Sequence, residues 1–281
     1  MRLPIVAGQF YPESKSELIS AIKQSFEHKL GKQMFPEKVS SSDLKAIISP
    51  HAGFVFSGPC ASHAFYEVGI NKTPETYIML GLSHQGNNTC LSDEDFETPL
   101  GIVKNNVGLT RLLSKQCNIE INNKNHHFER SLEVLLPFLQ FVKQNEKEEN
   151  VKIVPLMVGR ESLETIKRLA IGIKTALKDK DVIFLVSSDF THYGPNYGYM
   201  PDGNVKEMDM KAIGLIKKRD ALGLFNYHEE TAITICGIYP IILLLELVDF
   251  NKADLLSYYH STDIMAIDRS NSVSYASISF R

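Results

Sequence analysis

Short apolar runs and longer amphipathic stretches alternate along the chain. The short runs are rich in β-branched residues and stop at small or polar residues. An uninterrupted apolar run bounded by polar turn residues is typical of a strand covered on both faces, and such strands belong to parallel sheets. The pattern therefore predicts an α/β fold. The expected strands are Leu44–Ser49, Tyr77–Leu80, Val151–Val158, Val182–Val186, Leu255–His260 and Val273–Phe280.

The amphipathic stretches repeat their apolar positions at helical spacing. In residues 162–177 these positions form one stripe, which predicts a helix with one face toward the core. Ser14 and Glu17 fit a capping box, so a helix is expected to begin at Ser14. Gly58 and Pro59 are expected to open another helix, because proline is favoured in a first turn. Further helices are expected at 107–117, at 130–143 with a break near Pro137, at 205–227 and at 236–248.

Histidines and one aspartate follow three of the predicted strands. His51 lies in PHAG, His84 in GLSHQG, and Asp189 and His192 in SSDFTHYG. Open parallel sheets carry their sites beyond the carboxyl ends of their strands, so loops on neighbouring strands would meet at one edge. We therefore expect a shared site, in which Asp189 orients His192 and the ring moves protons near neutral pH. The alternatives are structural loop histidines and an aspartate that caps the following turn.

The composition is ordinary for a soluble globular protein. The 281 residues are 43% hydrophobic and 22% charged, with a net charge of −3. This balance argues against nucleic-acid binding, which needs a basic surface. We see no signal peptide, no apolar run that spans a bilayer and no disulfide pattern, so we expect a cytoplasmic protein without membrane contact. Neither a repeat nor a linker divides the chain, which predicts a single domain over 1–281.

Cys236 stands in TICG at the expected start of an apolar helix. Free amides and the helix dipole at such a position lower the pKa of a thiol and favour the thiolate, which binds metals or attacks electrophiles. The alternative is a small buried hydrophobic residue, which is the commonest role of a free cysteine. The other cysteines are expected to have that role, and they are Cys60, Cys90 and Cys117.

A charged cluster precedes another apolar helix, and it forms either a solvated helix start or part of a ligand-binding pocket. Its members are His126, His127, Glu129, Arg130 and Glu133. The Arg130 guanidinium either adds a fixed positive charge to the pocket or is neutralised by Glu129 or Glu133. The motifs GxGxxG, GxxxxGKS/T, HExxH and GxSxG do not occur in the sequence, which argues against common nucleotide-binding folds and two common hydrolase types.

Seven motifs, taken together, resemble those of the Memo (mediator of cell motility) family, whose archaeal and bacterial members are labelled AmmeMemoRadiSam system protein B. In chain order they are AGQFYP, ISPHAGFVFSG, LGLSHQG, SLEVLLPFLQ, VSSDFTHYG, TICG and SVSYAS, and they cover nearly the whole chain. The resemblance implies a three-layer α/β/α sandwich similar to the catalytic subunit of class III extradiol dioxygenases, which are non-haem iron enzymes.

The resemblance also implies a metal site. By motif, the ligands would be His51, His84 and Cys236, binding a single iron or copper ion, with Asp189 and His192 beside it. Animal members are described as redox proteins and as binders of phosphotyrosine peptides. Microbial members occur beside a radical-SAM protein, and their substrate is unknown. The implied partners are therefore a small-molecule or peptide ligand and, for a microbial protein, a radical-SAM protein.

The chain departs from the family pattern at one position. The family usually reads Glu-His-Ser-aliphatic-Glu, whereas residues 129–133 read Glu-Arg-Ser-Leu-Glu, so Arg130 puts a permanent cation in place of an imidazole. The implied thiolate ligand is also softer than the carboxylate of extradiol enzymes. It suits copper as well as iron or zinc and is itself oxidisable, which argues against efficient ring cleavage.

Three functions fit the sequence. The first is a metal-dependent oxidoreductase with dioxygenase-like chemistry, in which Asp189 and His192 are catalytic. The residues expected to contact its substrate are Glu129, Arg130 and Glu133. The second is a non-catalytic binding or scaffold module that uses the same cleft for a peptide, a phosphorylated ligand or a partner protein. The third is a hydrolase with Cys236 as nucleophile and His192 as base, which requires the two groups within about 3 Å.

Overall fold

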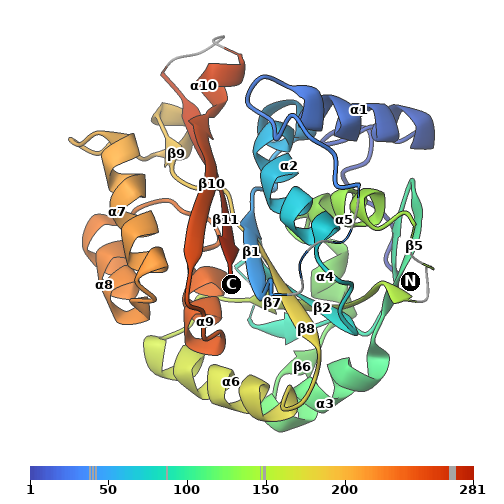
Figure 1. Cartoon of the computed structure of the whole chain (residues 1–281). Helices are drawn as coiled ribbons and strands as arrows, with labels where there is room; N and C mark the ends of the chain where they lie inside the picture. The colour runs from blue at the N-terminus through green and yellow to red at the C-terminus, as the bar shows by residue number, and fades with distance from the viewer. Residues whose placement is uncertain are drawn as a thin grey trace.

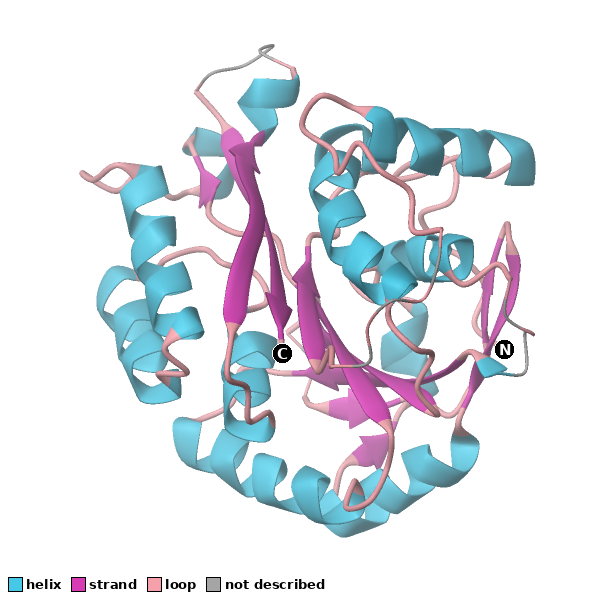
Figure 2. Ribbon diagram, viewed as in Figure 1, coloured by secondary structure: helices cyan, strands magenta, loops and turns pink. Residues whose placement is uncertain are grey.

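A computed structural model of the chain shows one mixed sheet with helices on both faces (Figure 1), and the same layers are visible in Figure 2. The predicted α/β/α sandwich is therefore confirmed. The described residues are 1–37, 39, 41, 43–86, 88–145, 147, 150–265 and 270–281. The strands are β1 (Ala46–Ser49), β2 (Thr76–Leu82), β3 (Cys90–Leu91), β4 (Phe96–Thr98), β5 (Gly101–Asn105), β6 (Glu120–Ile121), β7 (Lys152–Val158), β8 (Val182–Ser187), β9 (His192–Tyr193), β10 (Ala253–His260) and β11 (Ser272–Phe280).

The centre of the sheet is parallel. The strand order is β10-β11-β1-β8-β2-β7-β3-β6, and β1, β8, β2 and β7 run in the same direction. Val186 of β8 is paired with Ile48 of β1 on one side and with Leu80 of β2 on the other. The three strands that precede the histidine and aspartate loops are thus direct neighbours. Their carboxyl ends meet at one edge of the sheet, as the sequence predicts.

Successive side chains of each central strand enter two different cores. Ile48 and Leu80 belong to one core, and Ile47 and Met79 belong to the other. Because side chains alternate between the faces of a strand, burial on both faces removes any polar alternation from the sequence. The first core is covered by α3 (Val107–Cys117), α6 (Leu163–Ala176), α7 (Val205–Lys217), α8 (Ala221–Thr231) and α9 (Ile238–Leu247), and the second by α1 (Lys15–Glu27), α2 (Phe54–Ile70) and α5 (Leu136–Val142) (Figure 1).

Most predicted helices occur close to their expected bounds. The Ser14 side chain caps α1 by accepting the Glu17 N–H, as the capping box predicts. The stretch expected at 205–227 is divided into α7 and α8, because Asp220 begins the second helix by accepting the Gly223 N–H (2.8 Å). The expected break near Pro137 is a change from the 3-10 helix η1 (Glu133–Leu135) to α5. The remaining short helices in the described residues are α4 (Asn123–His127), α10 (Ser261–Ile264) and the 3-10 helix η3 (Pro195–Tyr197).

The prediction that Pro59 opens a helix is wrong, because α2 begins at Phe54 and contains Pro59 in its second turn. Near this proline, a tyrosine side chain bridges two backbone groups that would bond to each other in a regular helix. The Cys60 N–H donates to the Tyr259 hydroxyl (3.0 Å), and this hydroxyl donates to the Phe56 carbonyl (2.6 Å). Tyr259 of β10 is thus inserted where the direct Cys60–Phe56 bond of a regular helix would be. The contact that makes the proline tolerable comes from a distant part of the chain.

The apolar segment of α9 lies inside the protein. The helix spans Ile238–Leu247, and eight of its ten residues are buried, most of them in the first core. Over the described ranges of the chain, no helix combines the length and apolar character needed to cross a membrane. The turn-rich stretch before α3 forms a hairpin, in which β4 pairs antiparallel with β5.

Candidate metal centre

The loops beyond β1, β2 and β8 place one candidate side chain each at an equivalent point. His51 is the second residue after β1, His84 the second after β2, and Asp189 the second after β8. Because these strands are parallel neighbours, the shared offset brings the three loops to the same part of the sheet edge. The three loops therefore converge at one edge of the sheet, as the strand-end pattern predicts.

Cys236 reaches the same edge from the segment before α9. The backbone at Gly237 packs so closely against the end of β8 that an added Cβ would lie 2.5 Å from the Ser188 Cβ. The Gly237 N–H also donates to Ser188 Oγ (3.0 Å). A residue with a side chain would not allow this approach, so the glycine of TICG is what holds Cys236 beside Asp189.

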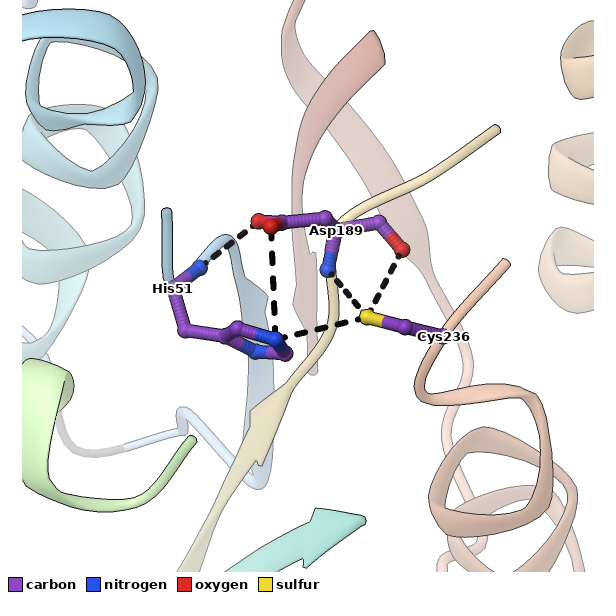
Figure 3. A group of neighbouring side chains, drawn as sticks. All are labelled: His51, Asp189 and Cys236. Carbon is purple, nitrogen blue, oxygen red and sulfur yellow. Dashed lines mark hydrogen bonds and ion pairs between the residues drawn. The ribbon is translucent and has the colours of Figure 1, made fainter. Parts of the chain in front are cut away.

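His51, Asp189 and Cys236 converge (Figure 3), and we call these three residues the His51 cluster. Their ligand-type atoms all lie within 4.8 Å of one another. His51 Nε2 is 3.4 Å from Cys236 Sγ and 3.9 Å from Asp189 Oδ2. Nitrogen and sulfur bound tetrahedrally to one ion are about 3.6 Å apart, so this spacing fits a single metal ion. Asp189, rather than the predicted His84, completes the group. The His84 ring centroid lies 5.4 Å from that of His51.

Hydrogen bonds fix the tautomer of His51. Ser187 Oγ donates to the Ser131 carbonyl (2.6 Å) and therefore accepts from His51 Nδ1 (2.8 Å). The lone pair of Nε2 consequently faces the thiol. Burial lowers the pKa of His51 to about 4, so the ring is neutral at neutral pH. Asp189 steadies the same loop, because its Oδ1 accepts the backbone N–H groups of His51 (2.8 Å) and Ala52 (3.2 Å).

Glu129, expected to line a ligand-binding pocket, orients His84. Its Oε1 accepts from His84 Nδ1 (2.7 Å) and from the Ser131 N–H (2.8 Å), and its Oε2 accepts from the His84 N–H (2.7 Å). Burial alone would raise the pKa of Glu129, but the hydrogen bonds from His84 outweigh it and hold this pKa at about 2. The ionised carboxylate therefore holds the Nδ1 proton, and in the neutral ring the lone pair is on Nε2. Many metal-binding histidines donate the N–H of their other ring nitrogen to a carboxylate in this way.

His192 has the same tautomer. Its Nδ1 lies 3.0 Å from the Phe190 carbonyl and 3.1 Å from the Thr234 carbonyl, so Nδ1 must donate, and in the neutral ring the lone pair is on Nε2. The ring packs edge-on against Tyr197, with 5.1 Å between centroids. A charge on this ring, if present, would lower the pKa of His51, after the larger effect of burial.

The thiol does not form a nucleophile–base pair with His192. Among the described residues, the polar contacts of Cys236 Sγ are with His51 Nε2, Ser188 Oγ and the backbone of Asp189. Burial, and then the charge of Asp189, raise the pKa of the Cys236 thiol well above its ordinary value. The predicted lowering is wrong, because Cys236 precedes the N-cap residue of α9 and Ser188 occupies the nearest free amide. A protonated thiol beside a neutral imidazole does not support the hydrolase hypothesis.

Glu133, also expected at the pocket, belongs to a buried group that we call the Arg2 cluster and that consists of Arg2, Tyr11 and Glu133. Arg2 Nη1 lies 2.6 Å from Glu133 Oε2, and both side chains have 0% exposure. The Tyr11 hydroxyl and the amides of Ile5 and Val6 donate to the same carboxylate. Glu133 therefore anchors the N-terminal segment. Nothing in the sequence indicates that Arg2 is the partner of Glu133, because no periodic pattern or motif marks a partner so distant in the chain.

Arg130 remains without a carboxylate partner in the described part of the chain. Its guanidinium carbon lies 5.5 Å from the centroid of the Phe10 ring, and its Nε is buried without a hydrogen-bond partner. The two acidic neighbours expected to neutralise it are bonded elsewhere, Glu129 to His84 and Glu133 to Arg2. Of the two outcomes left open by the sequence, local neutralisation is therefore not what the structure shows.

The His51 cluster consists of electron-pair donors that face one another. Nitrogen, sulfur and carboxylate oxygen converge, which is an arrangement typical of a cation site. The fold and this cluster together define an α/β/α protein with a candidate mononuclear metal site beyond the carboxyl edge of a parallel sheet. The chain belongs to the Memo-like family, because the family model described as "Memo-like protein" matches residues 2–279. The resemblance inferred from the seven motifs is confirmed.

Curated relatives agree with this assignment. A MEMO1 family protein of Desulfurococcus amylolyticus is 36% identical over 291 aligned positions, which cover 99% of this chain and 98% of the relative. A MEMO1 family protein of Sulfurisphaera tokodaii is 35% identical, with 100% of this chain and 99% of the relative covered. One from Methanopyrus kandleri is 32% identical at the same coverage. The similarity therefore extends over whole chains and is not limited to the site loops.

A solved structure supports the fold. The crystal structure of the uncharacterized protein JW3007 from Escherichia coli K12 superposes with a TM-score of 0.55 and 13% sequence identity. The superposition covers 85% of this chain and 100% of that protein. At this identity the likeness shows a shared α/β architecture and carries no information about the chemistry of the site.

Proposed function

We propose that the chain binds one iron or copper ion through His51, Cys236 and Asp189, with His84 as a further ligand, and uses it for redox chemistry on a small molecule. The observation that supports this proposal is the convergence of the His51 cluster, with His51 Nε2 at 3.4 Å from sulfur and 3.9 Å from a carboxylate oxygen. Asp189 is thereby assigned as a ligand, whereas the sequence predicted that it orients His192, a role that the Phe190 and Thr234 carbonyls have instead.

The donor set favours a redox-active transition metal. It combines imidazole, thiolate and carboxylate, and the soft thiolate suits copper and iron better than magnesium or calcium. When bound, such an ion supplies a Lewis acid that can change its oxidation state. The Cys236 thiol loses its proton on coordination, because a coordinating thiol is deprotonated even where burial otherwise keeps it neutral.

The surrounding residues orient the ligands and handle protons. Ser187 holds the Nδ1 proton of His51 and Glu129 holds that of His84, so each ring presents Nε2. His192 has its Nδ1 proton held by two backbone carbonyls, so its Nε2 can accept a proton from a bound substrate. We therefore assign proton transfer to His192 and orientation to Ser187 and Glu129.

Metal analysis of the purified protein tests the proposal. Wild-type protein prepared without added metal should contain iron or copper, and an anomalous-scattering map should place one ion between His51 and Cys236. Cys236→Ser should lose the metal, whereas Cys60→Ser should retain it, because Cys60 is buried in a separate apolar group with Tyr259 and Tyr275. Equal metal content in the two variants would contradict the ligand assignment.

The binding-module alternative differs in a measurable way. Metal-loaded protein can be supplied with O₂ or an electron donor in the presence of candidate small molecules. Oxygen consumption that depends on His192 supports the redox proposal, because Nε2 of this ring is the proton acceptor assigned above. A protein that retains its metal but shows neither oxygen consumption nor electron transfer would instead have a binding role.

A further inference from the structure

We propose that Arg130 recognises an anionic oxygen group, a carboxylate or a phosphate, on the small molecule that approaches the His51 cluster. The inference rests on the proposed function, since it assigns the chemical class of ligand for the same site. It depends on three features of Arg130: its position between two site loops, its lack of any charge partner among the described residues, and its contact with Phe10.

Arg130 lies between the loops that carry the two histidines. On one side, its chain neighbour Glu129 is bonded to His84 through both carboxylate oxygens. On the other side, the Arg130 guanidinium stacks on Phe10, whose carbonyl accepts the Phe54 N–H (2.8 Å). Phe54 begins α2 directly after the His51 loop. The guanidinium is therefore at the border of the candidate site.

The charge of Arg130 is uncompensated in the described part of the chain. No described Asp or Glu lies within ion-pairing distance of it, because Glu129 and Glu133 are committed to His84 and Arg2. Its Nε is buried and has no hydrogen-bond partner. A buried donor left unsatisfied is unfavourable, so a ligand atom that accepts from Nε recovers that free energy on binding.

The geometry around Arg130 favours an oxyanion. A guanidinium is planar and always charged, and it presents its N–H groups as a fork that matches two oxygens of a carboxylate or phosphate. The Phe10 ring contacts the guanidinium as a cation–π partner, and Nε has no hydrogen-bond partner among the described residues. A neutral ligand could accept one hydrogen bond but would leave the charge unpaired.

Three probes of similar shape test the inference on the full chain. Benzoate is the carboxylate probe, phenyl phosphate is the phosphate probe, and benzamide is a neutral molecule of nearly the same size as benzoate. Binding is measured by titration calorimetry, with and without bound metal. We expect wild-type protein to bind at least one anionic probe roughly ten-fold or more tightly than benzamide, since a paired charge–charge hydrogen bond contributes about 1.5–3 kcal/mol. The stronger of the two anions identifies the ligand chemistry.

Matched variants then assign the preference to one residue. Arg130→Gln should bind the three probes equally weakly, and Arg130→Lys should retain only part of the anion preference, because lysine keeps the charge but not the fork. Arg168→Gln is the control, since it makes the same change of charge on an exposed position of α6. It should behave as the wild type.

Two results would overturn the inference. The first is equal binding of benzoate, phenyl phosphate and benzamide by the wild type, which needs no variant to interpret. The second is an anion preference that persists in Arg130→Gln. The proposed metal centre is tested separately by metal content, so a protein that binds its ion but shows no anion preference refutes only the role of Arg130.

Discussion

The Arg2 cluster and the His51 cluster are both buried and polar, yet their hydrogen bonding differs. In the Arg2 cluster a cation meets a carboxylate at 2.6 Å, and a phenol and two amides satisfy the remaining lone pairs. In the His51 cluster an imidazole nitrogen, a sulfur and a carboxylate oxygen all face inward, and each is a lone-pair donor. The first group is complete by itself, whereas the second group presents the donor atoms of a candidate cation site.

This difference separates structural from functional polar residues. Buried polar atoms that satisfy one another hold the fold together, and Glu133 is of this kind. Buried polar groups whose ligand-type atoms converge on one point are instead candidates for a binding role, and His51 and Cys236 are of this kind. Sequence neighbours can thus have opposite roles, as Glu129 and Glu133 show at opposite ends of one short segment.

Breaking the Arg2 cluster should give the largest effect. Arg2→Met leaves the buried Glu133 carboxylate without its cation, and breaking one side of a buried pair costs about 3–5 kcal/mol. Urea unfolding at neutral pH measures the loss. Arg130→Met is the matched control and should change the free energy of unfolding by less than about 1 kcal/mol, because Arg130 Nε has no hydrogen-bond partner and no described Asp or Glu forms an ion pair with Arg130. Similar losses in both variants would show that Arg2 and Arg130 are equivalent.

Removing a ligand from the His51 cluster should act on metal affinity. We expect Cys236→Ser to weaken iron or copper binding by more than about 100-fold, because losing a ligand exceeds the 10–100-fold typical for a residue that orients one. Competition with a chelator of known affinity measures the change. Cys60→Ser should stay within a few-fold of the wild type. A Cys236→Ser protein with wild-type affinity would remove the thiol from the ligand set.

The orienting carboxylate should have a smaller effect on the same affinity. Glu129→Gln keeps the size of the side chain but removes the charge that holds the His84 Nδ1 proton, so metal affinity should fall by about 10–100-fold. Glu120→Gln, a change at an exposed acid in β6, should leave the affinity unchanged. If the two variants bind metal equally, Glu129 only supports the loop and does not tune His84.

The smallest effect concerns pH and a histidine bonded to the Arg2 cluster. His126 is buried beneath Arg2, whose Nε donates to its carbonyl (3.1 Å), and burial lowers the pKa of His126 to about 4. The folded state therefore prefers the neutral ring. This stability is complete above the unfolded pKa of about 6.5 and is lost as pH falls toward 4.

His126→Gln should remove that pH dependence. Between pH 6.5 and 5 the wild type should lose about 1.5 kcal/mol more of its unfolding free energy than the variant, from the difference between the folded and unfolded pKa values. Glutamine can still donate to the Cys90 carbonyl that His126 Nε2 contacts (3.2 Å). Denaturant unfolding at several pH values measures the slopes, and parallel slopes would show that His126 is not the titrating group. Above pH 7 no difference in slope is expected.

Much of the fold was readable from local patterns. The apolar runs at β1, β2 and β8 and the stripe of α6 gave the right elements, because burial on one or two faces leaves a period in the sequence. The helix at Pro59 was misplaced for a reason outside that pattern. Its start depends on the Tyr259 hydroxyl, which comes from β10 and replaces the missing backbone bond.

The candidate site was only partly readable. The strand-end positions of His51, His84 and Asp189 predicted a shared edge, and the Memo-like motifs added Cys236. Neither source indicated that Asp189, rather than His84, lies closest to His51 and Cys236. The lowered pKa predicted for the thiol was also wrong, because Asp189 and burial outweigh the helix start.

The sequence by itself determined which residues are buried and which stand at the ends of strands, since these follow from periodicities of a few residues. Only the tertiary structure decided which polar group meets which. Arg2 pairs with Glu133 and leaves Arg130 unpaired, although Arg130 is much nearer to Glu133 along the chain. Hydrogen bonds and ion pairs act over about 3 Å, so their partners depend on how distant segments pack and not on their spacing in the sequence.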